Sequence, residues 1–341
     1  MLEGLRSTLV IRLSSLGDVV LTAPVFTNLR AGLPDARLSL LVKRAFAAVF
    51  DGHPAVDEVL IFEDRGFWGW LREVRRRRFD TLVDLHDTPR SRLWSLFSGA
   101  ARRLRYDKRS GARRRLVWFK RSSPTLSGRT VDRYLETLAG LGLPVKSRTP
   151  ELFLKTNESL SPEWMSRLGD GPFIAVAPGA LHETKRWPGE RFAQAADRLA
   201  DIAGQRSNRA AQILLLGAAG DRPAAEETRR ALRGHAQDLA GQTTLREMML
   251  ILEKCAVLLT NDSGASHLGA ALGVPTVVLF GPTVKAFGFF PLGGKVAVME
   301  NPDLPCRPCT LHGGRKCPLG HFKCMTDIPV ESVVNAALTL L

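Results

Sequence analysis

Three short segments carry residues that can hold a phosphate group or move a proton, and each follows an apolar run. The most informative is 261–267, Asn-Asp-Ser-Gly-Ala-Ser-His. Asp262 and Ser263 favour the start of a helix, where unpaired N–H groups and the helix dipole attract anions. Gly264 leaves room for a phosphate, and His267 follows one turn later. Because its charge repels a diphosphate, Asp262 itself would cap the helix or accept a hydrogen bond from a hydroxyl. Pure capping is the alternative.

The segment 177–188, Ala-Pro-Gly-Ala-Leu-His-Glu-Thr-Lys-Arg-Trp-Pro, is the second candidate. A turn that contains glycine lets backbone N–H groups approach diphosphate oxygens, and the compact ammonium of Lys185 can neutralise them. Trp187 and Pro188 would fix the start of the next helix. The alternative is a surface loop anchored by its tryptophan.

The third segment, 14–18, directly follows the first apolar run and reads Ser-Ser-Leu-Gly-Asp. Gly17 permits a tight turn, and Asp18 begins the next helix. Asp18 can act as a base, or it can simply cap that helix. The segment lacks G-x-G-x-x-G spacing, and the chain contains no G-x-x-x-x-G-K-[ST] phosphate loop.

Four cysteines are clustered near the end of the chain. They are Cys306, Cys309, Cys317 and Cys324. Four thiolates suit tetrahedral zinc or iron, or an iron–sulfur cluster, with His312 and His321 as alternative ligands. Reduced thiols without metal are the other reading. Cys255 stands apart in a predicted apolar helix, as a buried free thiol.

These segments require β-strands that end at a common edge. The predicted strands are 9–13, 38–42, 59–62, 81–85, 173–177, 213–216, 256–260 and 276–280. The predicted helices are 19–30, 67–78, 130–141, 189–203, 223–232, 245–254, 264–272 and 330–341. This alternation is typical of parallel sheets covered on both faces.

The elements predict an α/β protein of two doubly wound domains. The expected boundaries are 1–160, 161–328 with the cysteine-rich segment 306–324, and a C-terminal helix at 329–341. Ligands of open α/β sheets bind at the carboxyl ends of the strands. Two such sheets that face each other would therefore place the active site in the cleft between them.

Composition restricts the partners. The net charge is +14, from 48 Lys and Arg against 34 Asp and Glu, and the excess lies in the basic runs 72–78 and 102–115. Such runs attract polyanions, or they form a solvated surface. The chain has two tyrosines, and few aromatic residues interrupt the arginines, so nucleic-acid binding is disfavoured. The run at 9–13 is too short for a signal peptide or a membrane span, which predicts a cytoplasmic protein.

Together, the segments 12–18, 185–188 and 261–267 resemble glycosyltransferase family 9, the bacterial heptosyltransferases of lipopolysaccharide core synthesis. The three motifs occur in family order with family spacing, and the resemblance covers nearly the whole chain. The resemblance implies a GT-B fold of two Rossmann-like domains, with the acceptor on the N-terminal domain and ADP-heptose on the C-terminal one. It also implies inversion at the anomeric carbon without a required divalent metal.

Residue roles follow from the resemblance by position. Asp18 matches the general base, and Lys185 the lysine that binds the donor diphosphate. The remaining donor-site positions are Ala180, Leu181, Asp262, Ser263, Gly264 and His267. Some relatives carry hydroxyl residues at 180 and 181, where this chain can offer only backbone N–H groups. The implied acceptor is a phosphorylated, Kdo-bearing lipid A at the inner membrane, where the basic runs would contact anionic groups.

Overall fold

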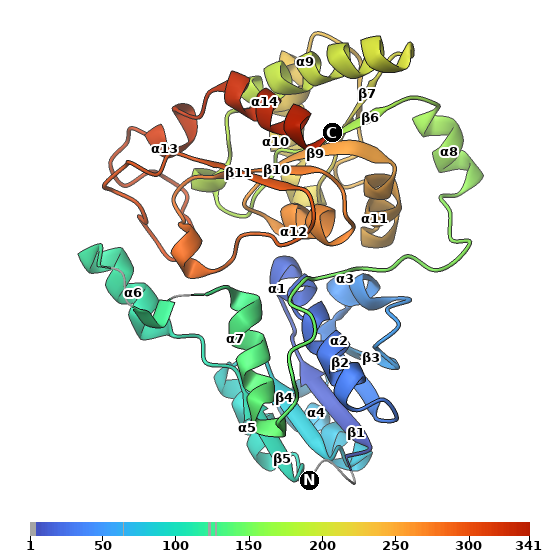
Figure 1. The fold of residues 1–341 in the computed structure, drawn as a ribbon, viewed down its shortest axis with the longest axis vertical. Helices are drawn as coiled ribbons and strands as arrows, with labels where there is room; N and C mark the ends of the chain where they lie inside the picture. The colour runs from blue at the N-terminus through green and yellow to red at the C-terminus, as the bar shows by residue number, and fades with distance from the viewer. Residues whose placement is uncertain (1–4, 64, 122–123, 127) are drawn as a thin grey trace. The chain divides into compact units, whose positions relative to one another are not determined.

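The computed structural model describes residues 5–63, 65–121, 124–126 and 128–341. Contacts divide the chain into two compact units (Figure 1). The first contains Met1–Ser110 and Gly128–Thr156, and the second contains Gly111–Ser127 and Asn157–Leu341. Among the helices in the described ranges, none is both long and apolar enough to cross a bilayer.

The first unit is a parallel sheet of five strands in the order β3-β2-β1-β4-β5. The strands are β1 Ser7–Ile11, β2 Arg37–Lys43, β3 Glu58–Phe62, β4 Thr81–Asp84 and β5 Arg102–Arg105. The helices are α1 Leu16–Val20, α2 Ala23–Gly32, α3 Arg44–Ala47, α4 Gly66–Arg77, α5 Pro89–Phe97 and α7 Thr130–Glu136. Helices α4 and α5 pack on one face of the sheet through Trp70, Leu71, Val74 and Trp94.

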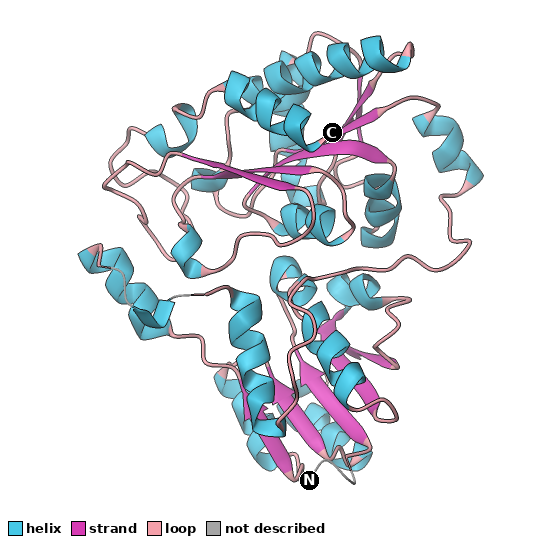
Figure 2. Ribbon diagram, viewed as in Figure 1, coloured by secondary structure: helices cyan, strands magenta, loops and turns pink. Residues whose placement is uncertain are grey.

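The second unit is a parallel sheet of six strands in the order β11-β10-β9-β6-β7-β8 (Figure 2). The strands are β6 Phe173–Ala177, β7 Gln212–Leu215, β8 Ala236–Asp238, β9 Cys255–Asn261, β10 Thr276–Phe280 and β11 Val296–Glu300. The helices are α6 Ser110–Phe119, α8 Pro162–Leu168, α9 Gly189–Ser207, α10 Arg222–Ala231, α11 Leu245–Glu253, α12 Gly264–Ala271, α13 Lys323–Thr326 and α14 Val330–Leu340. Helices α9 and α14 contact each other, and α11 contacts α12.

Several local predictions were wrong. The stretch 19–30 is not one helix, because α1 ends at Val20 and α2 begins at Ala23, with Pro24 in its first turn. Proline fits there because the first helical N–H groups have no partner inside the helix. Cys255 does not lie in a helix but begins β9, where its buried thiol donates to the carbonyl of Ile251 at 3.2 Å.

Part of the N-terminal half of the sequence packs with the second unit. In α6, Leu116 packs against Phe287, and the guanidinium of Arg113 lies 5.0 Å from the ring centre of Phe289. Lys120 donates hydrogen bonds to the carbonyls of Cys306 (3.0 Å) and Pro308 (2.5 Å). The basic run 102–115 is therefore shared between both units, although the predicted boundaries placed it wholly in the N-terminal domain.

Candidate functional site

In the first unit, Asp18 lies at the carboxyl edge of the sheet, in the first turn of α1 after β1. Its carboxylate is 2.7 Å from the guanidinium of the buried Arg12, which directly follows β1. The Ser15 hydroxyl donates to it at 2.9 Å and the Tyr134 hydroxyl at 3.2 Å. Asp18 thus has a capping contact, through the backbone N–H of Ser15 at 3.3 Å, and also a buried cationic partner that a simple cap would not need.

The pKa of Asp18 results from opposing effects. Burial alone raises it, but the charge of Arg12 and the hydrogen bonds from Ser15 outweigh burial and hold the pKa below its ordinary value of 3.8. The carboxylate is therefore ionised at neutral pH. An ionised carboxylate whose side chain is 17% exposed can receive a proton from a substrate hydroxyl.

Sequence reasoning gave no role to several residues around Asp18. The guanidinium of Arg12 lies 5.6 Å from the ring centre of Tyr134 and donates to the Leu85 carbonyl at 2.5 Å. Burial and the charges of Arg12 and Lys108 lower the pKa of His86 to about 4, which keeps its imidazole neutral at pH 7. Tyr134 is 116 residues from Asp18 in sequence, so no local motif could reveal it.

In the second unit, Lys185 and Asp262 form a buried ion pair. The ammonium of Lys185 lies 2.6 Å from a carboxylate oxygen of Asp262, and the Thr283 hydroxyl donates to the same oxygen at 2.8 Å. Asp262 therefore accepts a hydrogen bond from the Thr283 hydroxyl and holds the ammonium of Lys185 in place. The alternative in which Asp262 caps α12 is wrong, because Ser263 is the N-cap.

Asn261 joins the loops that carry this pair. Its side-chain amide donates to the carbonyl of Pro178 at 2.7 Å, and its side-chain oxygen accepts from the N–H of Trp187 at 2.9 Å. Asn261 is fully buried at the end of β9. One side chain thus connects the segment 177–188 to the 261–267 segment. The 261–267 motif contains Asn261, but local sequence does not indicate this role.

The loop after β6 differs from the expected phosphate-binding turn. A Cβ on Gly179 would lie 2.2 Å from the Asp221 carboxylate, so the glycine makes room for this side chain. Ala180 is buried and its carbonyl accepts from Arg186 at 3.0 Å, whereas the Leu181 side chain is 90% exposed. The packing of Asp221 against residue 179 is therefore enough to require a glycine there, and no bound phosphate is needed to explain it.

The start of α12 retains the features predicted for anion binding. Ser263 is extended at the N-cap and its side chain caps no N–H group, while Gly264 begins the helix. The Ser263 hydroxyl lies 3.4 Å from the Thr260 hydroxyl. His267 is buried one turn later. The first turn of α12 thus presents backbone N–H groups that no side chain of Ser263 occupies.

The cysteine-rich segment is hydrogen-bonded to the loop 281–283, which carries Thr283. The Cys309 N–H donates to the carbonyl of Pro282 at 3.1 Å, and Arg307 donates to the carbonyls of Gly281 (2.6 Å) and Thr283 (2.8 Å). These bonds fix the loop from which Thr283 reaches Asp262. All five cysteines are free thiols. Over the residues that the structure describes, no three His, Cys, Asp or Glu side chains are arranged to hold a metal ion.

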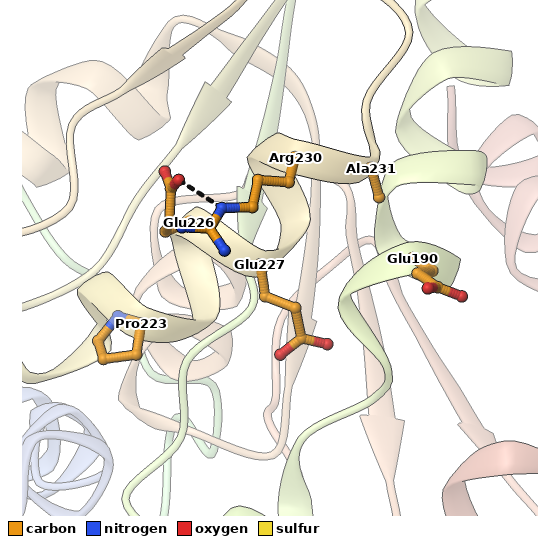
Figure 3. Close-up of a pocket in the computed structure, with 6 residues that line it drawn as sticks. All are labelled: Glu190, Pro223, Glu226, Glu227, Arg230 and Ala231. Atoms are coloured by element: carbon orange, nitrogen blue, oxygen red, sulfur yellow. Dashed lines mark hydrogen bonds and ion pairs between the residues drawn. The ribbon is translucent and has the colours of Figure 1, made fainter.

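A hollow of about 540 Å³ lies elsewhere in the second unit, beside α10 (Figure 3). Its charged side chains are Glu190, Glu226, Glu227 and Arg230. Glu226 is paired with Arg230 at 2.8 Å, and Glu227 accepts from the Gly189 N–H at 3.0 Å. Its carboxylates disfavour a diphosphate, and none of the motif residues lines it.

Comparisons with solved structures show the fold. A glycosyltransferase family 9 protein from Veillonella parvula superposes with a TM-score of 0.78 at 22% identity, covering 98% of this chain and 97% of that one. The ADP-heptose lipopolysaccharide heptosyltransferase II of E. coli gives 0.77 at 25% identity, covering 98% of both chains. The predicted fold class, GT-B with two Rossmann-like domains, is confirmed by these neighbours.

Sequence comparisons agree. Lipopolysaccharide heptosyltransferase 2 of Escherichia coli is 29% identical over 82% of this chain and 84% of its own length. Lipopolysaccharide heptosyltransferase 1 of Pseudomonas aeruginosa is 28% identical over 88% of this chain and 85% of its own. The model of glycosyltransferase family 9 (heptosyltransferase) matches residues 68–320. With both motif sites inside one GT-B chain, this match shows that the protein is an enzyme and belongs to glycosyltransferase family 9.

Proposed function

We propose that this enzyme transfers heptose from ADP-heptose to the Kdo/heptose inner core of lipopolysaccharide, with inversion at the anomeric carbon. Its relatives are named lipopolysaccharide heptosyltransferases, and one solved neighbour is the E. coli ADP-heptose lipopolysaccharide heptosyltransferase II. The observation that carries the proposal is the ionised, partly exposed carboxylate of Asp18 at the carboxyl edge of its sheet.

Asp18 acts on the acceptor in this proposal. Its carboxylate takes the proton of the attacking hydroxyl while the bond from the anomeric carbon to the diphosphate breaks. A single displacement through an oxocarbenium-like transition state inverts the anomeric centre. Arg12 and Tyr134 are positioning residues, because they hold the carboxylate without being the more exposed group.

Lys185 and the first turn of α12 act on the donor. The leaving ADP gains negative charge, which the ammonium of Lys185 and the N–H groups after Ser263 stabilise. Ala180, Leu181, Gly264 and His267 complete the proposed donor site. Lys185 and the N–H groups at the start of α12 stabilise the negative charge of the leaving ADP. We therefore propose that transfer requires no divalent metal. ADP release should then persist in EDTA.

The basic runs 72–78 and 102–115 are candidate contacts for an anionic acceptor. We propose a phosphorylated Kdo-lipid A acceptor, and a cytoplasmic enzyme peripheral to the inner membrane. Three arginines of the basic runs are poor candidates for contact with the acceptor. Arg76 and Arg77 are paired with Glu73, and Arg113 is buried against Phe289. Exposed arginines outside such pairs remain available to anionic head groups.

A donor screen tests the proposal. Purified enzyme and acceptor are supplied with ADP-heptose, other ADP-sugars and UDP-sugars, and the released nucleotide is measured. We expect ADP release with ADP-heptose. Turnover with a UDP-sugar alone would contradict the donor assignment and favour a transferase of the same fold that uses another sugar.

We further propose a structural zinc or iron ion at the cysteine cluster. Burial and the neighbouring thiols raise the pKa of Cys324 to about 11, whereas backbone N–H groups lower the pKa of Cys317 against the effect of burial. The thiols as placed do not form a complete ligand set, so binding requires them to rearrange. Elemental analysis of enzyme purified without chelator tests this, and less than about 0.2 metal per chain would contradict occupancy of the single four-thiolate site.

A further inference from the structure

Large apolar side chains are exposed along the outer surface of α4 and α5. The exposed fraction is 71% for Trp68, 43% for Leu93, 56% for Leu96 and 50% for Phe97. Isolated exposed apolar residues are ordinary in soluble proteins, but a cluster of four with two aromatics marks an interaction surface. We call these four residues the α4–α5 apolar patch.

The helical geometry places them together. On α5, Leu93, Leu96 and Phe97 follow i, i+3, i+4 spacing and form one stripe, while Trp94 points into the core. On α4, Arg77 pairs with Glu58 of the edge strand β3. Trp68 precedes Arg77 by nine residues, or about two and a half turns, and so lies on the opposite flank. That flank faces α5, which covers the β4–β5 edge of the same sheet.

Arginines that have no carboxylate partner among the described residues border the patch. No carboxylate of the described residues lies within ion-pair distance of Arg72, Arg75 or Arg90. Arg72 and Arg75 follow Trp68 at i+4 and i+7, and Arg90 precedes Leu93 by three residues, so both helices carry cations next to their apolar groups. Other arginines of α4 and α5 are paired, including Arg76, Arg77 and Arg92.

We propose that the α4–α5 apolar patch and its arginines dock this enzyme on an anionic lipid bilayer. Helical surfaces that combine tryptophan, phenylalanine and leucine with arginine insert at the boundary between head groups and acyl chains. The charge of the patch favours a lipid surface over a second copy of this chain. Anionic head groups attract the unpaired arginines, whereas the same surface of a second copy would repel them.

The orientation suits an acceptor that is anchored in lipid. Helices that connect parallel strands begin at the carboxyl edge of the sheet, so the N-terminal turns with Trp68 and Arg90 lie toward the edge that carries Asp18. This inference rests on the proposed lipid-linked acceptor for its purpose, but the binding itself can be measured without donor or acceptor.

Vesicle flotation of the full chain tests the proposal. We compare vesicles of phosphatidylcholine alone with vesicles that also contain phosphatidylglycerol. The wild-type enzyme should float with the anionic vesicles and lose binding at high salt. Trp68→Ser/Phe97→Ser should lower the partition coefficient roughly tenfold or more. Arg72→Gln/Arg75→Gln should lower it roughly fivefold per arginine on anionic vesicles.

The matched control lies on α6 in the other unit. Trp118 and Phe119 are 71% and 64% exposed, so Trp118→Ser/Phe119→Ser removes a similar apolar area. Because the exposed Arg114 and Arg115 precede these aromatic residues on α6, this variant shows whether a second surface of similar chemistry contributes, and it should lose less binding than Trp68→Ser/Phe97→Ser. Unfolding is checked by circular dichroism, and the Trp68→Ser/Phe97→Ser variant should keep full activity on a delipidated acceptor while losing it on vesicle-bound acceptor.

The proposal is overturned if wild type stays unbound, if Trp68→Ser/Phe97→Ser binds like wild type, or if only the α6 control loses binding. Light scattering provides one more test. A wild-type dimer that Trp68→Ser/Phe97→Ser dissociates would instead assign the patch to self-association. Failure of the donor screen with intact vesicle binding would reject the sugar assignment and leave this docking surface in place.

Discussion

The two units carry similar ion pairs with opposite exposure. In the first unit the aspartate is the more exposed partner, with Asp18 at 17% and Arg12 at 7%. In the second unit the cation is the more exposed partner, with Lys185 at 15% and Asp262 at 8%. Both pairs lie where a strand connects to the following helix, the position where α/β sheets bind ligands.

This difference indicates which partner acts on substrate. A buried charge needs its partner, and the more accessible member of the pair can reach a ligand. Asp18 is therefore presented to an acceptor hydroxyl, with Arg12 as its support. Lys185 is presented to the donor diphosphate, with Asp262 as its support. Two aspartates of similar setting thus receive different roles.

The largest effect is expected for Asp18→Asn. Removing the general base should lower kcat by about 10²–10⁴-fold, because the amide cannot accept the hydroxyl proton. ADP affinity, measured by calorimetry, should change little, since Asp18 does not bind the donor. Near-normal turnover in this variant would remove Asp18 from the base role.

Lys185→Met should have the next largest effect. Losing the ammonium should lower kcat by about 10²–10³-fold, as for other groups that stabilise charge in the transition state. ADP should also bind more weakly, which distinguishes this variant from Asp18→Asn. Lys185→Arg is the matched control that retains charge and should recover part of both losses. Unchanged ADP affinity in Lys185→Met would separate Lys185 from the diphosphate.

Arg12→Gln tests whether Arg12 holds the pKa of Asp18 low, and the readout is the pH dependence of kcat/KM. The pKa of Asp18 is lowered, so the wild-type carboxylate stays ionised as the pH falls through 3.8. Without Arg12, burial is less opposed and the pKa rises, so the acid limb of kcat/KM should move to higher pH. Ionised Asp18 also stabilises the folded protein at pH values above its pKa in the unfolded chain. As the pH falls, Arg12→Gln should lose this stabilisation at a higher pH than wild type does.

Two controls accompany this profile. Arg12→Lys keeps the charge and should keep the limb low. His86, whose pKa is about 4, titrates in the same range, and His86→Asn identifies its contribution. An acid limb that Arg12→Gln leaves in place would contradict the role of Arg12. Because breaking a buried pair costs about 3–5 kcal/mol, rates are measured below the melting transition of each variant.

The smallest effect is expected for Thr283→Val. This change removes the hydroxyl that donates to Asp262 at 2.8 Å while keeping the side-chain shape. Because the buried Asp262 oxygen loses a hydrogen-bond donor, the free energy of unfolding should fall by about 1–3 kcal/mol. The rate should fall by less than in Lys185→Met. Chemical denaturation and steady-state kinetics measure both. A rate loss equal to that of Lys185→Met would mean that Thr283 contacts substrate.

The sequence predicted the central strands more accurately than the sheet edges. Strands β6 and β10 match their predicted bounds because both are continuous buried apolar runs. Strands β5 and β8 were not predicted, since their side chains are not fully buried and carry no clear apolar pattern. Strand β11 was also missed, although residues 296–299 are an apolar run. Edge strands depend on pairing with a distant strand, which local sequence does not encode.

The site was predictable where it follows local motifs. Asp18, Lys185 and Asp262 were identified from strand-to-helix turns, and their assigned roles stay predictions. Their supports were missed because the contacts are long-range. Thr283 reaches Asp262 from 21 residues away, and Asn261 bonds the Pro178 carbonyl across 83 residues. Charge pairing and loop closure of this kind require the folded chain.

The most direct test compares the two aspartates. We measure kcat and ADP affinity for Asp18→Asn and Asp262→Asn under the same conditions. The exposure difference predicts that Asp18→Asn loses at least about tenfold more kcat, since it removes the base, whereas Asp262→Asn removes only the support of Lys185. Equal losses, or a larger loss of kcat in Asp262→Asn, would contradict the division of roles between the two ion pairs.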